Sequence, residues 1–125
     1  MTELTHTEWA VLDCLWTRSP LTLMELVAQL KQSMGWAKST TATMVRRMEE
    51  KGLITSQTVG KAKAFSTNVD RDKAEEQETK SFLTRVYKGS VGLMMSAMAK
   101  KQALSREEID ELYGILQQAE RTDAT

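Results

Sequence analysis

The sequence predicts a mostly α-helical protein in which three helices, a β-hairpin and three further helices follow one another. Apolar residues recur at i, i+3, i+4 and i+7 before Gly52 and again after Asp70, which is typical of helices with one buried face. Between these regions, residues 53–59 and 64–69 are rich in β-branched side chains and flank the turn signal 60–63. That pattern predicts the hairpin.

The composition excludes several classes of protein. The 125 residues include 17 basic and 17 acidic side chains, so the net charge is zero. The absence of a long apolar run and of a signal-peptide pattern predicts a cytoplasmic chain with no membrane partner. One cysteine, Cys14, and one histidine, His6, cannot complete a four-ligand zinc site, and we expect no metal or cofactor. Without a nucleophile–base pair or a phosphate loop, the chain is not expected to be an enzyme.

Two capping boxes define the first two helices. Thr5 with Glu8 starts a helix over residues 6–18, and Thr22 with Glu25 starts the second. The apolar positions of these helices are Trp9, Leu12, Trp16, Leu23, Leu26, Val27 and Leu30. We expect all of them, both tryptophans included, to lie in the core.

The third helix, from Ala37 or Lys38 to Lys51, has two chemically different faces. The inner stripe is Thr41, Met44, Val45 and Met48, and the outer stripe is Ser39, Thr40, Thr43, Arg46 and Arg47. Gly52 follows at the position that favours positive φ. The apolar stripe is expected to pack on the first two helices and to leave the hydroxyls and arginines outside.

Three helices followed by a hairpin with a basic tip are the winged helix-turn-helix arrangement, whose second helix-turn-helix member enters the major groove of DNA. Hydroxyls can read base edges and arginine reaches guanine or phosphate. The segment 36–65 carries six basic and two acidic residues, a local basic face in a neutral chain. The predicted DNA-contacting residues are Trp36, Lys38, Ser39, Thr40, Thr43, Arg46, Arg47, and, at the hairpin tip, Lys61 and Lys63. The alternative to DNA contact is that these side chains are only solvent-exposed and that Trp36 packs at the corner between the second and third helices.

The second half of the chain is predicted to dimerise. Helices are predicted over residues 71–88, 90–102 and about 106–119, the last one after a third capping box of Ser105 with Glu108, and the residues from Arg121 onward are expected to fray. Each helix has a single apolar stripe, and about 50 residues of this kind bury too little alone. A two-fold dimer is the commonest solution. The residues expected at its interface are Phe82, Val86, Met94, Met98, Leu112 and Leu116. The predicted domains are therefore a DNA-binding domain, 1–69, and a dimerisation domain, 70–125; the alternative is a monomer in which the second domain packs on the first.

The order and spacing of several segments resemble the BlaI/MecI/CopY family of winged-helix repressors, also called penicillinase repressors. The resemblance covers residues 4–119 and rests on LTHTEWAVLDCLW, LTLMELVAQL, GWAKSTTATMVRRMEEKGLI, GKAKAFST, ETKSFLTRVYKGSV and LSREEIDELYGIL. It implies a homodimeric repressor on a palindromic operator. Thr40, Thr43 and Arg47 match the residue types of the family's recognition helix, and Trp36 matches the tryptophan before it.

The chain departs from the family pattern at four places. Ala37-Lys38 replaces the usual opening of the third helix, and Glu49-Glu50 stands where relatives are often basic. Relatives that respond to β-lactams are cut by a membrane-bound sensor protease at an Asn-Phe bond, whose place is taken here by Ala97-Met98. Ala97 and Met98 are thus the candidate cleavage point and the protease a candidate partner. The lack of cysteine after Cys14 excludes copper sensing by a thiolate cluster.

The sequence therefore predicts a sequence-specific transcriptional repressor that binds double-stranded DNA as a homodimer. The alternative is a winged-helix protein–protein adaptor that does not bind DNA, which the zero net charge and Glu49-Glu50 favour.

Overall fold

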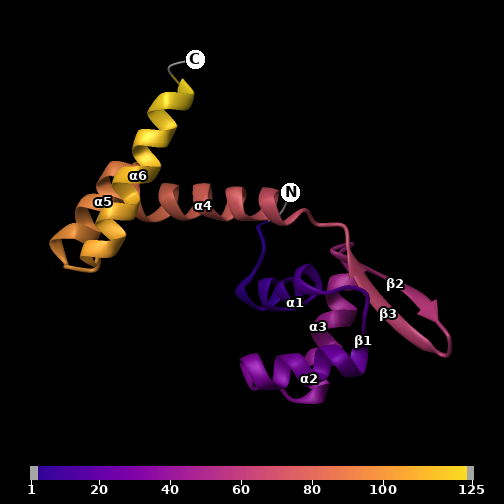
Figure 1. Cartoon of the computed structure of the whole chain (residues 1–125). Helices are drawn as coiled ribbons and strands as arrows, with labels where there is room; N and C mark the ends of the chain where they lie inside the picture. The colour runs from indigo at the N-terminus through magenta and orange to yellow at the C-terminus, as the bar shows by residue number, and fades with distance from the viewer. Residues whose placement is uncertain (1–2, 124–125) are drawn as a thin grey trace. The chain divides into compact units, whose positions relative to one another are not determined.

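The computed structural model describes residues 3–123 and has the element order that the sequence predicts, with one added strand (Figure 1). The elements are α1 (His6–Thr17), β1 (Leu21–Thr22), α2 (Leu23–Met34), α3 (Lys38–Glu50), β2 (Ile54–Val59), β3 (Ala62–Thr67), α4 (Arg71–Tyr87), α5 (Val91–Lys100) and α6 (Arg106–Asp123). The predicted winged-helix fold class is confirmed.

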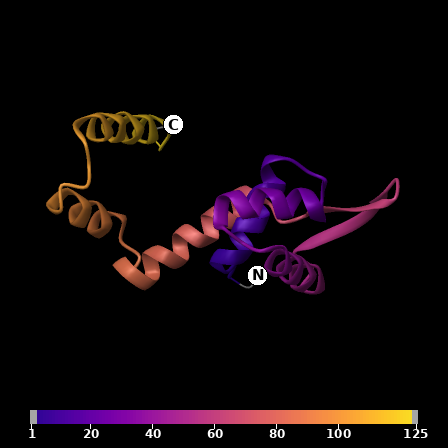
Figure 2. The same ribbon diagram turned by 90° about the horizontal axis from the view of Figure 1, so that it is seen from below.

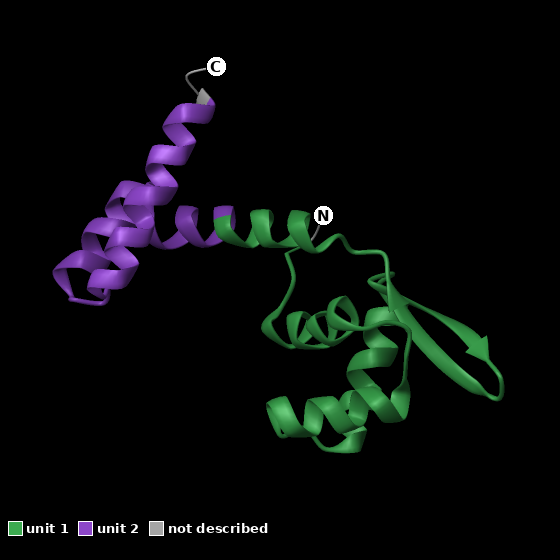
Figure 3. Ribbon diagram, in the orientation of Figure 1, with its two compact units in different colours: residues 1–79 green, residues 80–125 purple. Residues whose placement is uncertain are grey.

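The chain forms two compact units, Met1–Thr79 and Lys80–Thr125 (Figure 3). We call them the N-terminal unit and the C-terminal unit. Their boundary falls inside α4, whereas the sequence places a domain boundary after residue 69. The first turns of α4 therefore belong with the winged helix.

The core of the N-terminal unit joins α1, α2 and α3 to the three strands of the sheet. Its buried members are Val11, Leu12, Leu15, Leu21, Leu26, Leu30, Val45, Met48, Ile54 and Phe65. Each fully buried side chain of this size contributes about 1.5–3 kcal/mol by leaving water. Because α3 supplies Val45 and Met48, its outer face is held in a fixed orientation.

The sheet is antiparallel with strand order β1-β3-β2. The sequence missed β1, because two residues are too short to form an alternating pattern. Leu21 of β1 lies opposite Phe65, so the chain between α1 and α2 is hydrogen-bonded to the base of the hairpin, which we call the wing. The wing extends away from α1–α3 in both views (Figures 1 and 2).

The turn of the wing is shorter than the sequence predicts. Val59 pairs with Ala62, which leaves only Gly60 and Lys61 in the turn. Gly60 has φ +65°, as a two-residue turn with glycine first requires. The predicted turn over residues 60–63 is therefore wrong, and Lys63 lies in β3, not at the tip.

The predicted capping boxes are present at α1 and α2, whereas α3 starts without a side-chain cap. Both predicted capping boxes are formed, Thr5 with Glu8 and Thr22 with Glu25. At α3 the N-cap is Ala37, and no side chain caps the helix. Lys51 is the C-cap of α3, and the following Gly52 has φ +80°, as predicted.

Trp9 and Trp16 are only half-buried, which corrects the prediction that both lie in the core. Their rings pack edge to face with centroids 5.2 Å apart. Trp16 Nε1 donates to the Val69 carbonyl at 2.9 Å, and the Arg71 guanidinium lies 5.6 Å from the Trp16 ring. The indole N–H needs a hydrogen-bond partner when the ring leaves water. Here its bond to Val69 links the chain after β3 to α1.

The C-terminal unit has well-capped helices but no buried side chain among residues 80–122. Ser90 caps α5, and Ser105 with Glu108 forms the predicted third capping box. Helix α6 continues to Asp123, beyond the predicted end near residue 119. The expected fraying from Arg121 onward is therefore wrong as far as Asp123, and residues 124–125 lie outside the described part of the chain.

Candidate nucleic-acid interface

The outer face of α3 is exposed along its whole length. Its exposed residues are Lys38, Ser39, Thr40, Arg46 and Arg47, and Thr43 is half-buried between them. On the opposite face Thr41, Val45 and Met48 are buried. The division into an apolar inner stripe and a polar outer stripe is as the sequence predicts.

The start of α3 combines a helix N-terminus with basic and hydroxyl side chains. The Ala37 carbonyl accepts from the backbone N–H groups of Thr40 and Thr41 at 3.1 and 3.2 Å, and no side chain caps this end. Lys38 and Ser39 occupy the exposed first turn. Because the N-terminal end of a helix carries a partial positive charge, this end of α3 favours an anion.

Both acidic residues at the end of α3 have partners within the N-terminal unit. Glu50 and Arg46 lie 3.5 Å apart with 64% of each side chain exposed, which makes a weak and easily broken pair. Glu49 turns toward the wing, where it accepts hydrogen bonds from Ser56 and Lys63. These bonds hold the pKa of Glu49 below its ordinary value. The sequence could not reveal them, because they depend on the register of the hairpin.

The two predicted lysines of the wing differ in their surroundings. Lys61 lies in the exposed turn and, among the described residues, forms no ion pair. Lys63 Nζ lies 3.1 Å from Glu49 Oε1 and 5.4 Å from the centre of the Phe65 ring. The wing therefore offers one unengaged ammonium group, Lys61 in the turn, and a second, Lys63 in β3, that is engaged within the protein.

Trp36 lies half-buried against the core in the turn before α3. Its backbone N–H donates to the Leu30 carbonyl at 3.3 Å. Packing at the corner between α2 and α3 therefore accounts for most of its surface, as in the alternative that the sequence left open.

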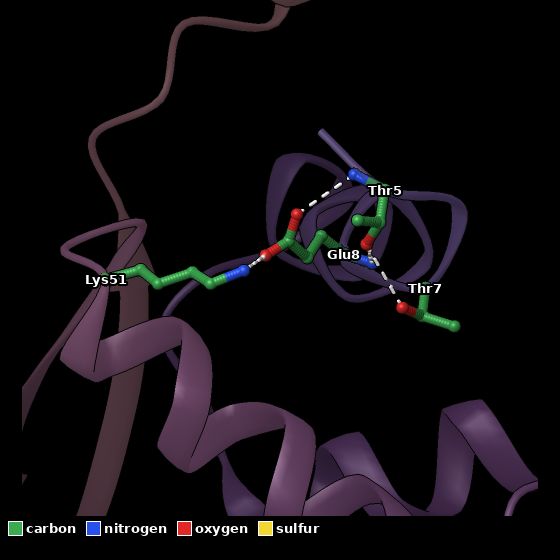
Figure 4. A network of polar contacts seen from close by, with 4 residues as sticks. All are labelled: Thr5, Thr7, Glu8 and Lys51. Atoms are coloured by element: carbon green, nitrogen blue, oxygen red, sulfur yellow. Dashed lines mark hydrogen bonds and ion pairs between the residues drawn. The ribbon is translucent and has the colours of Figure 1, made fainter. Parts of the chain in front are cut away.

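The buried carboxylate of Glu8 in α1 contacts Lys51, the C-cap residue of α3 (Figure 4). One oxygen accepts from the Thr5 backbone N–H at 2.9 Å and the other from Lys51 Nζ at 2.8 Å. Burial raises the pKa of Glu8, but the bonds from Lys51 and Thr5 outweigh it, so that the pKa lies below its ordinary value. Sequence reasoning identified Glu8 only as a capping residue.

The residues predicted for the dimer interface are exposed or half-buried. Phe82, Val86 and Leu116 are 39%, 49% and 61% exposed, and Met94, Met98 and Leu112 are half-buried. Further exposed apolar residues in the same unit are Val91, Leu93, Tyr113 and Ile115. The candidate cleavage pair, Ala97 and Met98, lies within α5 and is half-buried.

Cys14 and the acidic side chains of the described residues show neither an activated thiol nor a metal-binding cluster. Burial, with the Asp13 charge nearby, raises the pKa of the Cys14 thiol and keeps it protonated. Over residues 3–123, no cluster of three His, Cys, Asp or Glu side chains is suited to a metal ion. Within the same range, every helix is too short or too polar to cross a membrane.

Comparison with known proteins gives one consistent family. The penicillinase repressor family matches residues 4–118. The penicillinase repressor of Bacillus licheniformis is 29% identical over 116 residues, which cover 93% of this chain and 91% of that protein. The methicillin resistance regulatory protein MecI of Staphylococcus aureus (strain N315) is 25% identical over 114 residues, which cover 91% of this chain and 93% of MecI.

Solved structures share the fold at low identity. One is the solution structure of monomeric B. licheniformis BlaI in complex with the blaP half-operator, with TM-score 0.52 and 22% identity. It covers 57% of this chain and 87% of BlaI. The oxidised form of MarR from E. coli has TM-score 0.54 and 15% identity, covering 94% of this chain and 76% of MarR. These similarities establish the winged helix alone.

The family match extends over nearly the whole chain, both units included. It confirms the predicted repressor over the adaptor, and it confirms that the chain is not an enzyme, because the family consists of repressors. The chain belongs to the penicillinase repressor family.

Proposed function

We propose that this repressor binds double-stranded DNA sequence-specifically, as a homodimer on a palindromic operator. The observation that carries the proposal is the outer face of α3, an exposed row of hydroxyl and basic side chains on a helix whose inner face is fixed in the core. Such a helix can enter the major groove without unfolding or rearranging the domain.

Each part of the face has a distinct task. Thr40 and Thr43 read base edges, since a threonine offers a hydroxyl for hydrogen bonding and a methyl group for contact with thymine. Arg46 and Arg47 reach guanine or phosphate. Lys38 and Ser39, at the uncapped start of α3, bind phosphate and fix the register of the helix in the groove.

The wing and Trp36 complete the proposed surface. Lys61 in the exposed turn contacts the neighbouring phosphates. Trp36 braces the corner before α3, and only its exposed edge contributes to DNA. The solution structure of BlaI with a half-operator, together with the shared family, supports this use of the surface.

The absence of a core in the C-terminal unit supports dimerisation. No side chain is buried over residues 80–122, although these helices carry large apolar residues. A second copy removes these apolar stripes from water, and two-fold symmetry matches a palindrome. The proposed interface residues are Phe82, Val86, Met94, Met98, Leu112 and Leu116.

Release from DNA would follow from a cut at Ala97-Met98 or between α5 and α6, because either cut separates α6 from the rest of the chain. Ala97 and Met98 are the proposed cleavage point, with a sensor protease as partner, and cleavage requires local opening of α5 because both residues are helical. A cytoplasmic location completes the proposal, as binding to chromosomal DNA demands it.

Titration of the purified chain on DNA tests the proposal. A palindrome selected from a random pool is compared with its scrambled sequence at several salt concentrations. We expect preference for the palindrome and a log–log salt slope on the order of −4 to −9, at about 0.9 per phosphate contact. Equal binding to both sequences, or a slope near zero, would exclude sequence-specific DNA binding.

A further inference from the structure

Glu49 connects the last turn of α3 to both strands of the wing. Its Oε2 accepts from Ser56 Oγ on β2 at 2.5 Å, and its Oε1 accepts from Lys63 Nζ on β3 at 3.1 Å. The side chain is 33% exposed. A single carboxylate is thus shared between the two strands, and we call this set of three residues the wing clamp.

The wing clamp lies where the packing of the hairpin ends. At the base of the hairpin Ile54, Ala64 and Phe65 are buried, whereas residues 57–62 are all exposed. Ser56 lies opposite Phe65 in the sheet, and Lys63 is two residues away along β3, so Ser56, Phe65 and Lys63 share one face. The two hydrogen bonds of the clamp link the wing to α3 just before the exposed segment of residues 57–62.

An unsupported two-stranded tip is marginally stable in water. Hydrogen bonds to an ionised group are stronger than neutral ones, and α3 is fixed by the core, so the clamp limits the movement of the wing relative to α3. The Lys63 ammonium is held on two sides, by the Glu49 carboxylate and by the Phe65 ring. Lys61 has neither contact.

We infer that Glu49 is a positioning residue for DNA recognition: it fixes the wing against α3 and keeps Lys63 engaged within the protein, so that Lys61 supplies the wing's phosphate contact. The inference rests on the proposed function, because it concerns how the wing meets DNA. It also reassigns Lys63, which the sequence placed at the tip beside Lys61.

Hydrogen exchange of the free protein tests the clamp without DNA. Glu49→Gln removes the charge and weakens both bonds, and the backbone amides of β2 and β3 near the tip are expected to exchange about fivefold faster, the factor for one lost hydrogen bond. Glu50→Gln is the matched control, because it removes the same charge one residue along α3 without touching the wing. Equal exchange in wild type and Glu49→Gln would overturn the inference.

The salt dependence of DNA binding tests the assignment of the lysines. Lys61→Ala is expected to reduce the slope by about 0.9 per bound chain, and Lys63→Ala to leave it unchanged. In the Glu49→Gln variant Lys63 is free to contact phosphate, so the magnitude of the salt slope is expected to rise by about 0.9 per bound chain. Adding Lys63→Ala to that variant should cancel the rise.

The hydrogen-exchange and DNA-binding experiments distinguish a failure of the inference from a failure of the proposed function. If the wild-type chain fails to bind DNA, the proposed function fails, and hydrogen exchange still decides whether Glu49 holds the wing. If DNA binds and Lys63→Ala lowers the salt slope as much as Lys61→Ala, Lys63 contacts phosphate and the inference is wrong.

Discussion

The Lys51 ammonium and the buried carboxylate of Glu8 lie 2.8 Å apart and join the end of α3 to the first turn of α1 (Figure 4). Only 5% of the Glu8 side chain is exposed, compared with 60% for Lys51. One carboxylate thus caps α1 through Thr5 and anchors the recognition helix through Lys51. The pair holds α3 at the end opposite to its uncapped N-terminus.

Removing the charge of Glu8 should destabilise the chain in a pH-dependent way. Glu8→Gln keeps the bond to Thr5 but loses the ion pair, and we expect the free energy of unfolding to fall by about 1–2 kcal/mol near neutral pH. Because the pKa of Glu8 in the folded chain lies below its unfolded value of about 4, the contribution is complete above that pH. It is lost as the pH falls through the folded value, so wild type and variant converge in acid.

Urea unfolding at a fixed protein concentration, repeated across the acid range, measures this difference. The matched control is Glu25→Gln, because Glu25 forms the same type of capping box with Thr22 but is 41% exposed and pairs with exposed Arg18. The control should change stability by less than Glu8→Gln. Equal losses in the two variants would mean that the capping box, not the pair with Lys51, accounts for the effect.

Replacing Thr41 by valine should stabilise the chain. Thr41 is fully buried on the inner face of α3, and its Oγ1 has no hydrogen-bond partner among the described residues. Valine has nearly the same shape without the hydroxyl, so the free energy of unfolding should rise by about 1 kcal/mol. Thermal unfolding checks this, with exposed Thr40→Val as the control that should leave stability nearly unchanged. A lower stability of Thr41→Val would reveal an unseen partner of the hydroxyl.

Thr43 and Lys61 should differ in their effects on sequence preference. Thr43→Ala is expected to weaken binding to the preferred palindrome by about 1–3 kcal/mol and to relax the preference at one base position. Lys61→Ala should weaken the palindrome and its scrambled version by similar factors. Titrations of both variants on both DNAs make the comparison. Identical behaviour of the two variants would show that the outer face of α3 does not read bases.

Loss of the C-terminal helices should uncouple the two half-sites. A fragment of residues 1–97 lacks the end of α5 and all of α6, and it should be largely monomeric. It should bind the palindrome at least about a hundredfold more weakly than the full chain, because the second half-site is no longer held at millimolar effective concentration. Sedimentation and titration on the same DNA measure both properties. Leu116→Glu in the full chain should act in the same direction, while the neighbouring Gln117→Glu should not. A fragment that stays dimeric would locate the dimer contacts elsewhere.

Local sequence was sufficient for most of the fold. The capping boxes at Thr5, Thr22 and Ser105 and the helical spacing of apolar residues are properties of neighbouring residues, so they predicted where the helices begin and which face is buried. The same spacing assigned the outer face of α3. The two-residue strand β1 and the short turn at Gly60 could not be predicted from the sequence, because both are defined by pairing with β3.

The chain's own sequence thus determined the order of its elements, the two faces of α3 and the class of surface that α3 presents. Only the tertiary structure decided which partners the charged residues take. Glu8 meets Lys51 across 43 positions of sequence, and Glu49 meets Lys63 across 14. Such contacts depend on how helices and strands pack and on the hairpin register, and a one-residue change of register would turn Lys63 to the other face of the wing.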